Sequence, residues 1–103
     1  MAHMTSEFRF EKYKSAEQAK ASLLEQHPVG SPVKTLVATL EKAGAKCGPI
    51  TNPDYKDKYK GIIYCELIKP SFLSQSEWKV IIYPDESTIN INSFEVFKHF
   101  TAL

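Results

Sequence analysis

The stretch Glu77-Trp78-Lys79-Val80-Ile81-Ile82-Tyr83 decides the fold, because both its composition and its periodicity are those of a β-strand. Its side chains alternate between two faces, with Trp78, Val80 and Ile82 on one face and Ile81 and Tyr83 on the other. Pro84-Asp85-Glu86-Ser87 has the composition of a turn, and residues 88–99 are again rich in β-branched and aromatic side chains. The sequence therefore predicts an antiparallel hairpin.

The second strand of this hairpin changes parity along its length. Ile89 and Ile91 fall on one face, whereas strict alternation places Phe94 and Val96 on the other. One extra residue in a strand reverses its register. We therefore predict a β-bulge near Asn92-Ser93, which would place all four apolar side chains on the core side.

Two more segments upstream of the hairpin have strand character. Residues 61–68 are β-branched and aromatic, and residues 45–50 form a shorter candidate that is stopped by prolines. Together with the hairpin they predict a three- to four-stranded antiparallel β-meander.

Two helices are expected before the strands. Ser15 and Gln18 have the spacing of a capping box, and Pro28 ends the first helix near Gln26. In the second helix, Ser31 is the expected N-cap.

The second helix has Pro32 at its expected first position, and Gly44 is suited to close it. The linker at residues 28–30 is short, so the two helices are expected to form an αα-hairpin. The predicted fold class is α+β, with this N-terminal helical hairpin packed on one face of the meander.

A chain of 103 residues is expected to form one domain. We interpret residues 1–4 as a cloning scar, residues 5–14 as an N-terminal arm and residues 15–103 as a single α+β domain. The formal net charge of +1 produces no strong field that would attract nucleic acid or an anionic membrane surface. No apolar run approaches the roughly 20 residues that a membrane-spanning helix needs.

Cys47 and Cys65 lie on segments that we expect to be neighbouring strands. A disulfide between them is geometrically possible and would imply an oxidising compartment. The alternative is two unpaired cysteines that serve as small core residues. No CxxC motif and no adjacent histidine points to a metal site or to thiol catalysis.

Two segments are candidate binding surfaces. Phe8 and Phe10 alternate with polar residues in the N-terminal arm, which either docks on a partner or lays its aromatic rings on the core. Tyr55, Lys58 and Tyr59 belong to a charged loop that is either a protein contact or simply solvated. Its acidic residues cancel part of the lysine charge, so nucleic acid is not an expected partner.

No catalytic constellation is recognisable in the sequence. His27 is expected at the end of the first helix and His99 near the chain end, and neither lies near a nucleophile and an acid in a triad pattern. We expect no enzyme activity, no metal and no cofactor. A small enzyme of unrecognised class remains an alternative hypothesis, since catalytic partners can be distant in sequence.

The order of motifs from Pro28 to Val96 carries a family resemblance. It runs through Pro28-Val29-Gly30-Ser31-Pro32, an amphipathic helix, Tyr64-Cys65, and a tryptophan strand followed by Pro84-Asp85. This order resembles small bacterial envelope proteins of the outer-membrane lipoprotein SmpA/OmlA (BamE) type, and the related β-lactamase-inhibitor-like domains. The resemblance implies two helices on one face of a β-meander and a non-enzymatic protein-binding role.

The expected function is therefore a protein-binding module of the bacterial cell envelope. Its expected location is the periplasm or the outer membrane, in the latter case through an N-terminal lipid anchor that this sequence does not contain. Thr5-Ser6-Glu7 would suit the residues after an acylated cysteine. The alternative is a cytoplasmic immunity, adaptor or effector-type binding protein, which reduced cysteines would favour.

Overall fold

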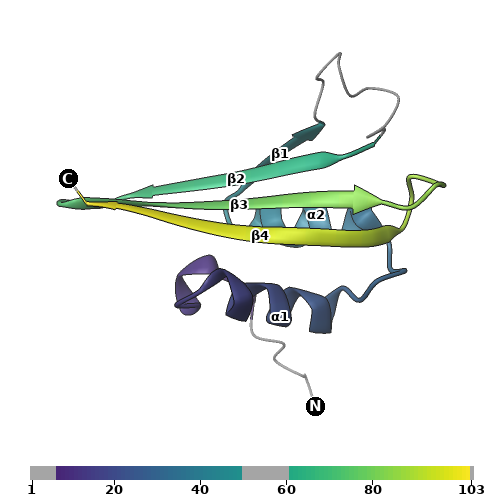
Figure 1. The fold of residues 1–103 in the computed structure, drawn as a ribbon, viewed down its shortest axis with the longest axis horizontal. Coiled ribbons are helices and arrows are strands. Elements are labelled where there is room, and N and C mark those ends of the chain that lie inside the picture. Colours follow the sequence, from purple (N-terminus) through teal and green to yellow (C-terminus); the bar gives the residue numbers. More distant parts are fainter. Residues whose placement is uncertain (1–6, 50–60, 103) are drawn as a thin grey trace.

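The computed structural model describes residues 7–49 and 61–102 (Figure 1). Its elements are, in chain order, η1 (Phe10–Lys12), α1 (Ala16–Gln26), α2 (Val33–Lys42), β1 (Lys46–Pro49), β2 (Ile63–Pro70), β3 (Ser74–Pro84) and β4 (Ile91–Ala102). The four strands form one antiparallel sheet in the order β1-β2-β3-β4. The predicted α+β fold, with two N-terminal helices packed against an antiparallel meander, is confirmed.

The core lies between the helices and one face of the sheet. Trp78, Val80 and Ile82 of β3 are buried on this face, as their alternation predicts. Cross-strand pairing places the buried Cys65 and Leu67 of β2 beside them. Because α1 lies along β4 and α2 lies close to β1, the two helices together cover much of this face.

The predicted β-bulge is present in β4. Tyr83 pairs with Ser93, whereas the next residue, Pro84, pairs with Ile91, so Asn92 is the extra residue. The bulge lets Ile91 and Phe94, three positions apart, both bury their side chains, each with 1% exposure. The prediction fails for Ile89, which is 64% exposed.

Ile89 is exposed because its backbone follows a different path from that of a regular strand. Thr88, just before it, has a φ of 62°, which turns the chain out of strand geometry. The carbonyl of Ile89 accepts from the amide of Val33 at 2.8 Å, and Asn90 bridges to Pro32. This segment therefore joins the helix linker to the sheet instead of filling the core.

The start of α1 follows the predicted capping box. The Ser15 hydroxyl accepts from the Gln18 amide at 3.2 Å, and the Gln18 side chain accepts from the Lys14 amide at 3.1 Å. The helix ends at Gln26, as expected from Pro28. The Gln18 amide, which the first turn leaves without an intrahelical partner, is thus satisfied, and the reciprocal bond reaches Lys14, one residue before the N-cap.

The predicted cap of α2 is wrong by one residue. The N-cap position is Pro32, which has no side chain that can cap. The Ser31 hydroxyl instead donates to the carbonyl of Pro28, and the Ser31 carbonyl accepts from the amide of Ile91. Ser31 does not occupy the N-cap position because its backbone pairs with the start of β4.

One end of the sheet extends past the helices. The segment 70–76, which lies between the strands expected at residues 61–68 and 77–83, is also largely strand, because Ser74, Gln75 and Ser76 pair with residues 100–102 of β4. In Figure 1 the β2–β3 turn and the C-terminal end of β4 project together beyond α1 and α2. We call this part, residues 69–76 and 98–102, the sheet tip.

Candidate functional site

The predicted aromatic arm is part of the core and not a free binding surface. Phe8 and Phe10 are 3% and 1% exposed. The Phe10 ring lies 5.1 Å from the Trp78 ring, and Phe8 stacks on Tyr13 at 5.3 Å between centroids. Covering the large Trp78 surface is the physical reason for this position, since aromatic rings bury the most apolar area. Of the two alternatives for the arm, the structure shows the one in which the aromatic rings lie on the core.

The predicted loop site of Tyr55, Lys58 and Tyr59 lies outside the described residues. No geometry is therefore available for its proposed protein contact, which stays a prediction.

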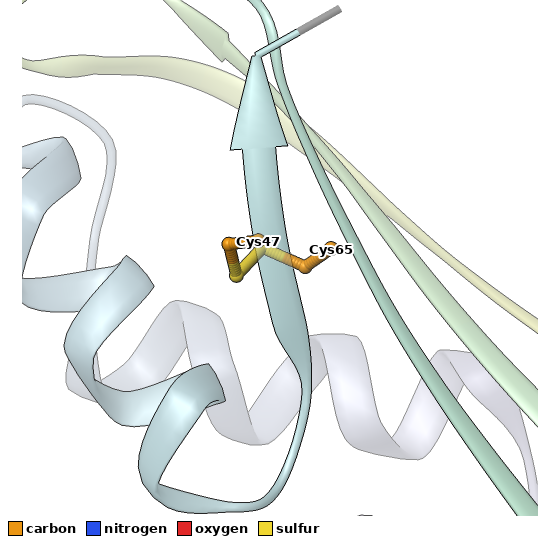
Figure 2. Close-up of a disulfide and its surroundings, with 2 residues drawn as sticks. All are labelled: Cys47 and Cys65. Carbon is orange, nitrogen blue, oxygen red and sulfur yellow. A yellow bond between two sulfur atoms is a disulfide. The ribbon is translucent and has the colours of Figure 1, made fainter.

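A disulfide joins Cys47 of β1 to Cys65 of β2 (Figure 2). The two residues lie directly opposite each other in the antiparallel ladder. Cys65 is buried in the core and Cys47 is half-buried against it. The bridge therefore fastens the short edge strand β1 to the rest of the sheet.

The sheet face that points away from the helices is the candidate binding surface, and we call it the open face. Alternation and register assign its residues. Across the four strands, one row consists of Lys46, Glu66, Lys79 and Phe97, in that order. The charges in this row alternate in sign, so neighbours attract each other.

The next row of the open face lies nearer the sheet tip. Ile68, Glu77 and His99 lie side by side on β2, β3 and β4. Glu77 is 3.8 Å from the ammonium group of Lys79, in the neighbouring row. Ile68 is 45% exposed and Phe97 is 48% exposed, so the open face presents apolar side chains beside charged ones.

A depression of about 510 Å³ lies on this part of the sheet. Its lining comes from β3 and β4, namely Glu77, Lys79, Phe97, Lys98 and His99. An aromatic ring flanked by a carboxylate, an ammonium group and an imidazole suits a polypeptide partner, which offers apolar and charged side chains together.

Tyr64 of β2 is hydrogen-bonded to Glu66 on the open face. The Tyr64 hydroxyl donates to Glu66 Oε2 at 2.9 Å. Burial, together with this hydrogen bond to a carboxylate, raises the pKa of Tyr64 to about 12. The phenol therefore stays protonated at neutral pH and acts as a fixed hydrogen-bond donor.

The two candidate histidines lie in different environments. His27 is buried, and its Nε2 is 2.8 Å from Thr39 Oγ1. Thr35 donates to the Pro32 carbonyl, so its oxygen is left to accept from Nδ1 at 3.4 Å. In that tautomer Thr39 donates to Nε2, and both ring nitrogens of the neutral imidazole are satisfied. Burial lowers the pKa of His27, which marks it as a core residue.

Within residues 7–49 and 61–102, no group of three or more His, Cys, Asp or Glu side chains is placed to hold a metal ion. Over the same residues, no helix is long and apolar enough to cross a membrane. His99 lies exposed on the open face, opposite Glu77.

Sequence reasoning missed the exposed apolar residues of the sheet tip. Phe72 is 93% exposed, Leu73 65% and Phe100 61%. One signal for them is present in the sequence: the turn Ser71-Phe72-Leu73-Ser74 has apolar residues where turns usually have Gly, Asn or Asp. The exposure of Phe100 follows only from the length of β4 relative to the helices.

No known protein family, curated protein or solved structure matches this chain. The functional argument therefore rests on the geometry of the chain itself.

Proposed function

We propose that this chain is a non-enzymatic protein-binding module of the bacterial cell envelope, and that it binds its partner on the open face. The observation that carries the proposal is the exposure of Ile68 and Phe97 on the sheet face that the helices leave uncovered. The solvated face of an antiparallel sheet is usually polar. Aromatic and aliphatic side chains there, close to charged ones, are typical of protein interfaces.

The charge pattern of the open face supports a polypeptide partner over a nucleic acid. Lys46, Glu66 and Lys79 alternate in sign across three strands. Nucleic-acid surfaces need a cluster of cations that neutralises phosphates, and an interleaved carboxylate opposes such binding. Alternating charges instead offer specificity toward a protein with the complementary pattern.

The proposed compartment rests on the Cys47–Cys65 disulfide. Disulfides persist in oxidising compartments and are rare in the cytoplasm. The bridge therefore supports a location in the periplasm or on the outer membrane, as does the resemblance of the motif order to BamE-type proteins. A cytoplasmic binding protein is the competing hypothesis, and it requires both thiols to be reduced in the cell.

Site-specific photo-crosslinking in cells tests the binding surface. A photoreactive phenylalanine analogue is placed at Phe97 on the open face and, as a control, at the exposed Lys34 on α2. We expect a discrete crosslinked adduct from position 97 and none from position 34. A charge-exchanged variant, Glu77→Lys with Lys79→Glu, keeps the net charge and is expected to reduce the adduct from position 97.

Equal adducts from the two positions, or none from position 97, would show that the open face is not the binding surface. Quenching the cells with acid and alkylating the unfolded protein, so that the otherwise buried Cys65 is accessible, tests the compartment separately. Resistance of Cys47 and Cys65 to alkylation without a reductant is the expected result, and rapid alkylation would favour the cytoplasmic hypothesis.

A further inference from the structure

We propose that the sheet tip is a membrane-contact site that inserts Phe72 and Leu73 into the interface of an anionic lipid bilayer. Phe72 and Leu73 lie in the β2–β3 turn, outside the rows that form the open face, and the proposal does not depend on the protein-binding role. The proposal rests on the shape of the tip, the exposure of its apolar side chains and the distribution of charge around it.

The turn between β2 and β3 presents its two apolar residues at the end of a projection. The Ser71 amide donates to the Ser74 carbonyl at 2.7 Å, and the two serine hydroxyls are 2.8 Å apart. The turn is thus closed by its serines, while Phe72 and Leu73 are 93% and 65% exposed at its centre. These residues contribute nothing to the core, and turn geometry does not favour them at these positions.

The shape of the tip favours a bilayer over the flat surface of another protein. The turn and the adjacent end of β4 lie past the ends of both helices (Figure 1), so they can meet a surface before the helices touch it. Apolar groups of this kind bury themselves in the boundary between headgroups and acyl chains. The hydrogen bonds within the turn limit the number of polar backbone groups that insertion would leave unsatisfied.

The charge of the sheet tip is complementary to an anionic headgroup layer. Residues 69–76 and 98–102 contain Lys69, Lys98 and His99 and no acidic residue. The nearest carboxylates are Glu11, 3.4 Å from the Lys69 ammonium group, and Glu77, opposite His99. The Glu11–Lys69 pair is half exposed on both sides, so it is weak and leaves Lys69 free to meet a phosphate.

Lys98 is held in place on the helix-facing side of the tip. Its ammonium group lies 5.0 Å from the Trp78 ring centroid and donates to the Lys14 carbonyl at 3.3 Å. The overall charge of +1 conceals this local excess of cations. Lysines beside inserted apolar residues are the usual combination at membrane interfaces.

Vesicle flotation tests the proposal with two compositions, phosphatidylcholine alone and phosphatidylcholine with an equal part of phosphatidylserine. We expect the protein to float with the anionic vesicles and more weakly with the neutral ones. The double variant Phe72→Ser/Leu73→Ser is expected to lower the partition coefficient at least roughly tenfold, because two apolar side chains leave the interface. Lys69→Gln is expected to lower anionic binding roughly fivefold and to leave neutral binding unchanged.

The matched control is Val29→Ser/Ile89→Ser, which removes two exposed apolar side chains in the helix linker and the β3–β4 turn. It is expected to float like the wild type. Tryptophan fluorescence with brominated lipid gives a second readout, the depth of insertion. We expect the lipid to quench the emission of a tryptophan introduced by Phe72→Trp. It should quench neither a tryptophan introduced by Ile89→Trp nor the buried native Trp78. All five variant positions are exposed, so folding is expected to be retained, and circular dichroism checks it.

Absence of flotation, or equal losses from the tip and control variants, would overturn the proposal. Concentration-dependent self-association that the tip variant abolishes, without any vesicle binding, would overturn it as well and assign the tip to a second copy of the chain. Crosslinking from the open face is independent of these results, so failure of one proposal does not imply failure of the other.

Discussion

At the scale of single residues, the Cys47–Cys65 bridge is expected to have the largest effect on stability. It closes a loop with a sequence separation of 18 residues, for which loop entropy predicts about 3 kcal/mol of stabilisation. We predict that Cys47→Ala/Cys65→Ala lowers the free energy of unfolding by roughly that amount, measured by urea denaturation. Alanine is chosen because serine would bury a hydroxyl at position 65.

Reductant is the control for this prediction. It should destabilise the wild type by a similar amount and leave the double variant unchanged. A wild type whose unfolding midpoint is the same with and without reductant would show that the bridge is not formed in solution.

His27 provides the second prediction at this scale, a dependence of stability on pH. Burial lowers the pKa of the folded imidazole below the 6.5 of an unperturbed histidine. Below pH 6.5 the unfolded chain therefore binds more protons than the folded chain. The contribution of His27 to stability is complete above that pH and is lost as the pH falls through the lowered pKa.

The measurement is the free energy of unfolding above and below pH 6.5, for the wild type and for His27→Gln. Acidification should destabilise the wild type more than the variant, because glutamine does not titrate. Parallel pH profiles for the two proteins would contradict the burial of a neutral imidazole between Thr35 and Thr39.

At the scale of elements, the position of the bulge in β4 predicts which residue of the strand can be deleted without loss of the fold. Removing Asn92 lets Ser93 follow Ile91 directly, which gives a continuous ladder and keeps Ile91 on the core side. The variant is expected to fold, with a change in unfolding free energy of less than about 1 kcal/mol. Urea denaturation and circular dichroism measure this outcome.

Deletion of Glu95 from the same strand is the matched control. This deletion puts Phe94 and Val96 on opposite faces of the sheet. The Phe94 ring, which is 1% exposed in the native fold, would then leave the core. Loss of such a ring costs about 3–5 kcal/mol, a large part of the stability of a small domain, so this variant is expected to be unfolded or strongly destabilised. Equal tolerance of the two deletions would mean that Asn92 is not the extra residue.

Periodicity and turn chemistry were sufficient to predict the element order, the start of α1 and the position of the bulge. They failed where a hydrogen bond to a residue distant in sequence determines the conformation of the backbone. Ser31 does not cap α2, because its backbone carbonyl accepts from the amide of Ile91. The Ile89 side chain is exposed, because its backbone carbonyl accepts from the amide of Val33. Local sequence contains no information about either contact.

The candidate site was less predictable than the fold. Phe8 and Phe10 have the alternation of an exposed strand, but they cover Trp78, which only the tertiary structure brings to them. Phe97 and Ile68 look like core residues by composition. They are exposed because the open face receives no second layer from the described chain, which the strand pattern alone does not reveal.

At the scale of the whole molecule, the described chain consists of two layers with an uncovered face and a projecting tip. The helices cover one side of the sheet, the open face presents Phe97 among charges, and the tip presents Phe72 and Leu73. These surfaces point in different directions, so one molecule can contact a bilayer at its end while it holds a protein partner on its side.

Hydroxyl-radical footprinting tests the central claim, that a protein partner covers the open face. The purified protein is labelled alone and after addition to a detergent-solubilised envelope extract, and labelling is quantified by mass spectrometry. The account predicts that labelling of Phe97 and His99 falls in the extract, whereas labelling of Val29, exposed in the helix linker, is unchanged. Unchanged labelling of Phe97 and His99, or an equal decrease at Val29, would contradict it.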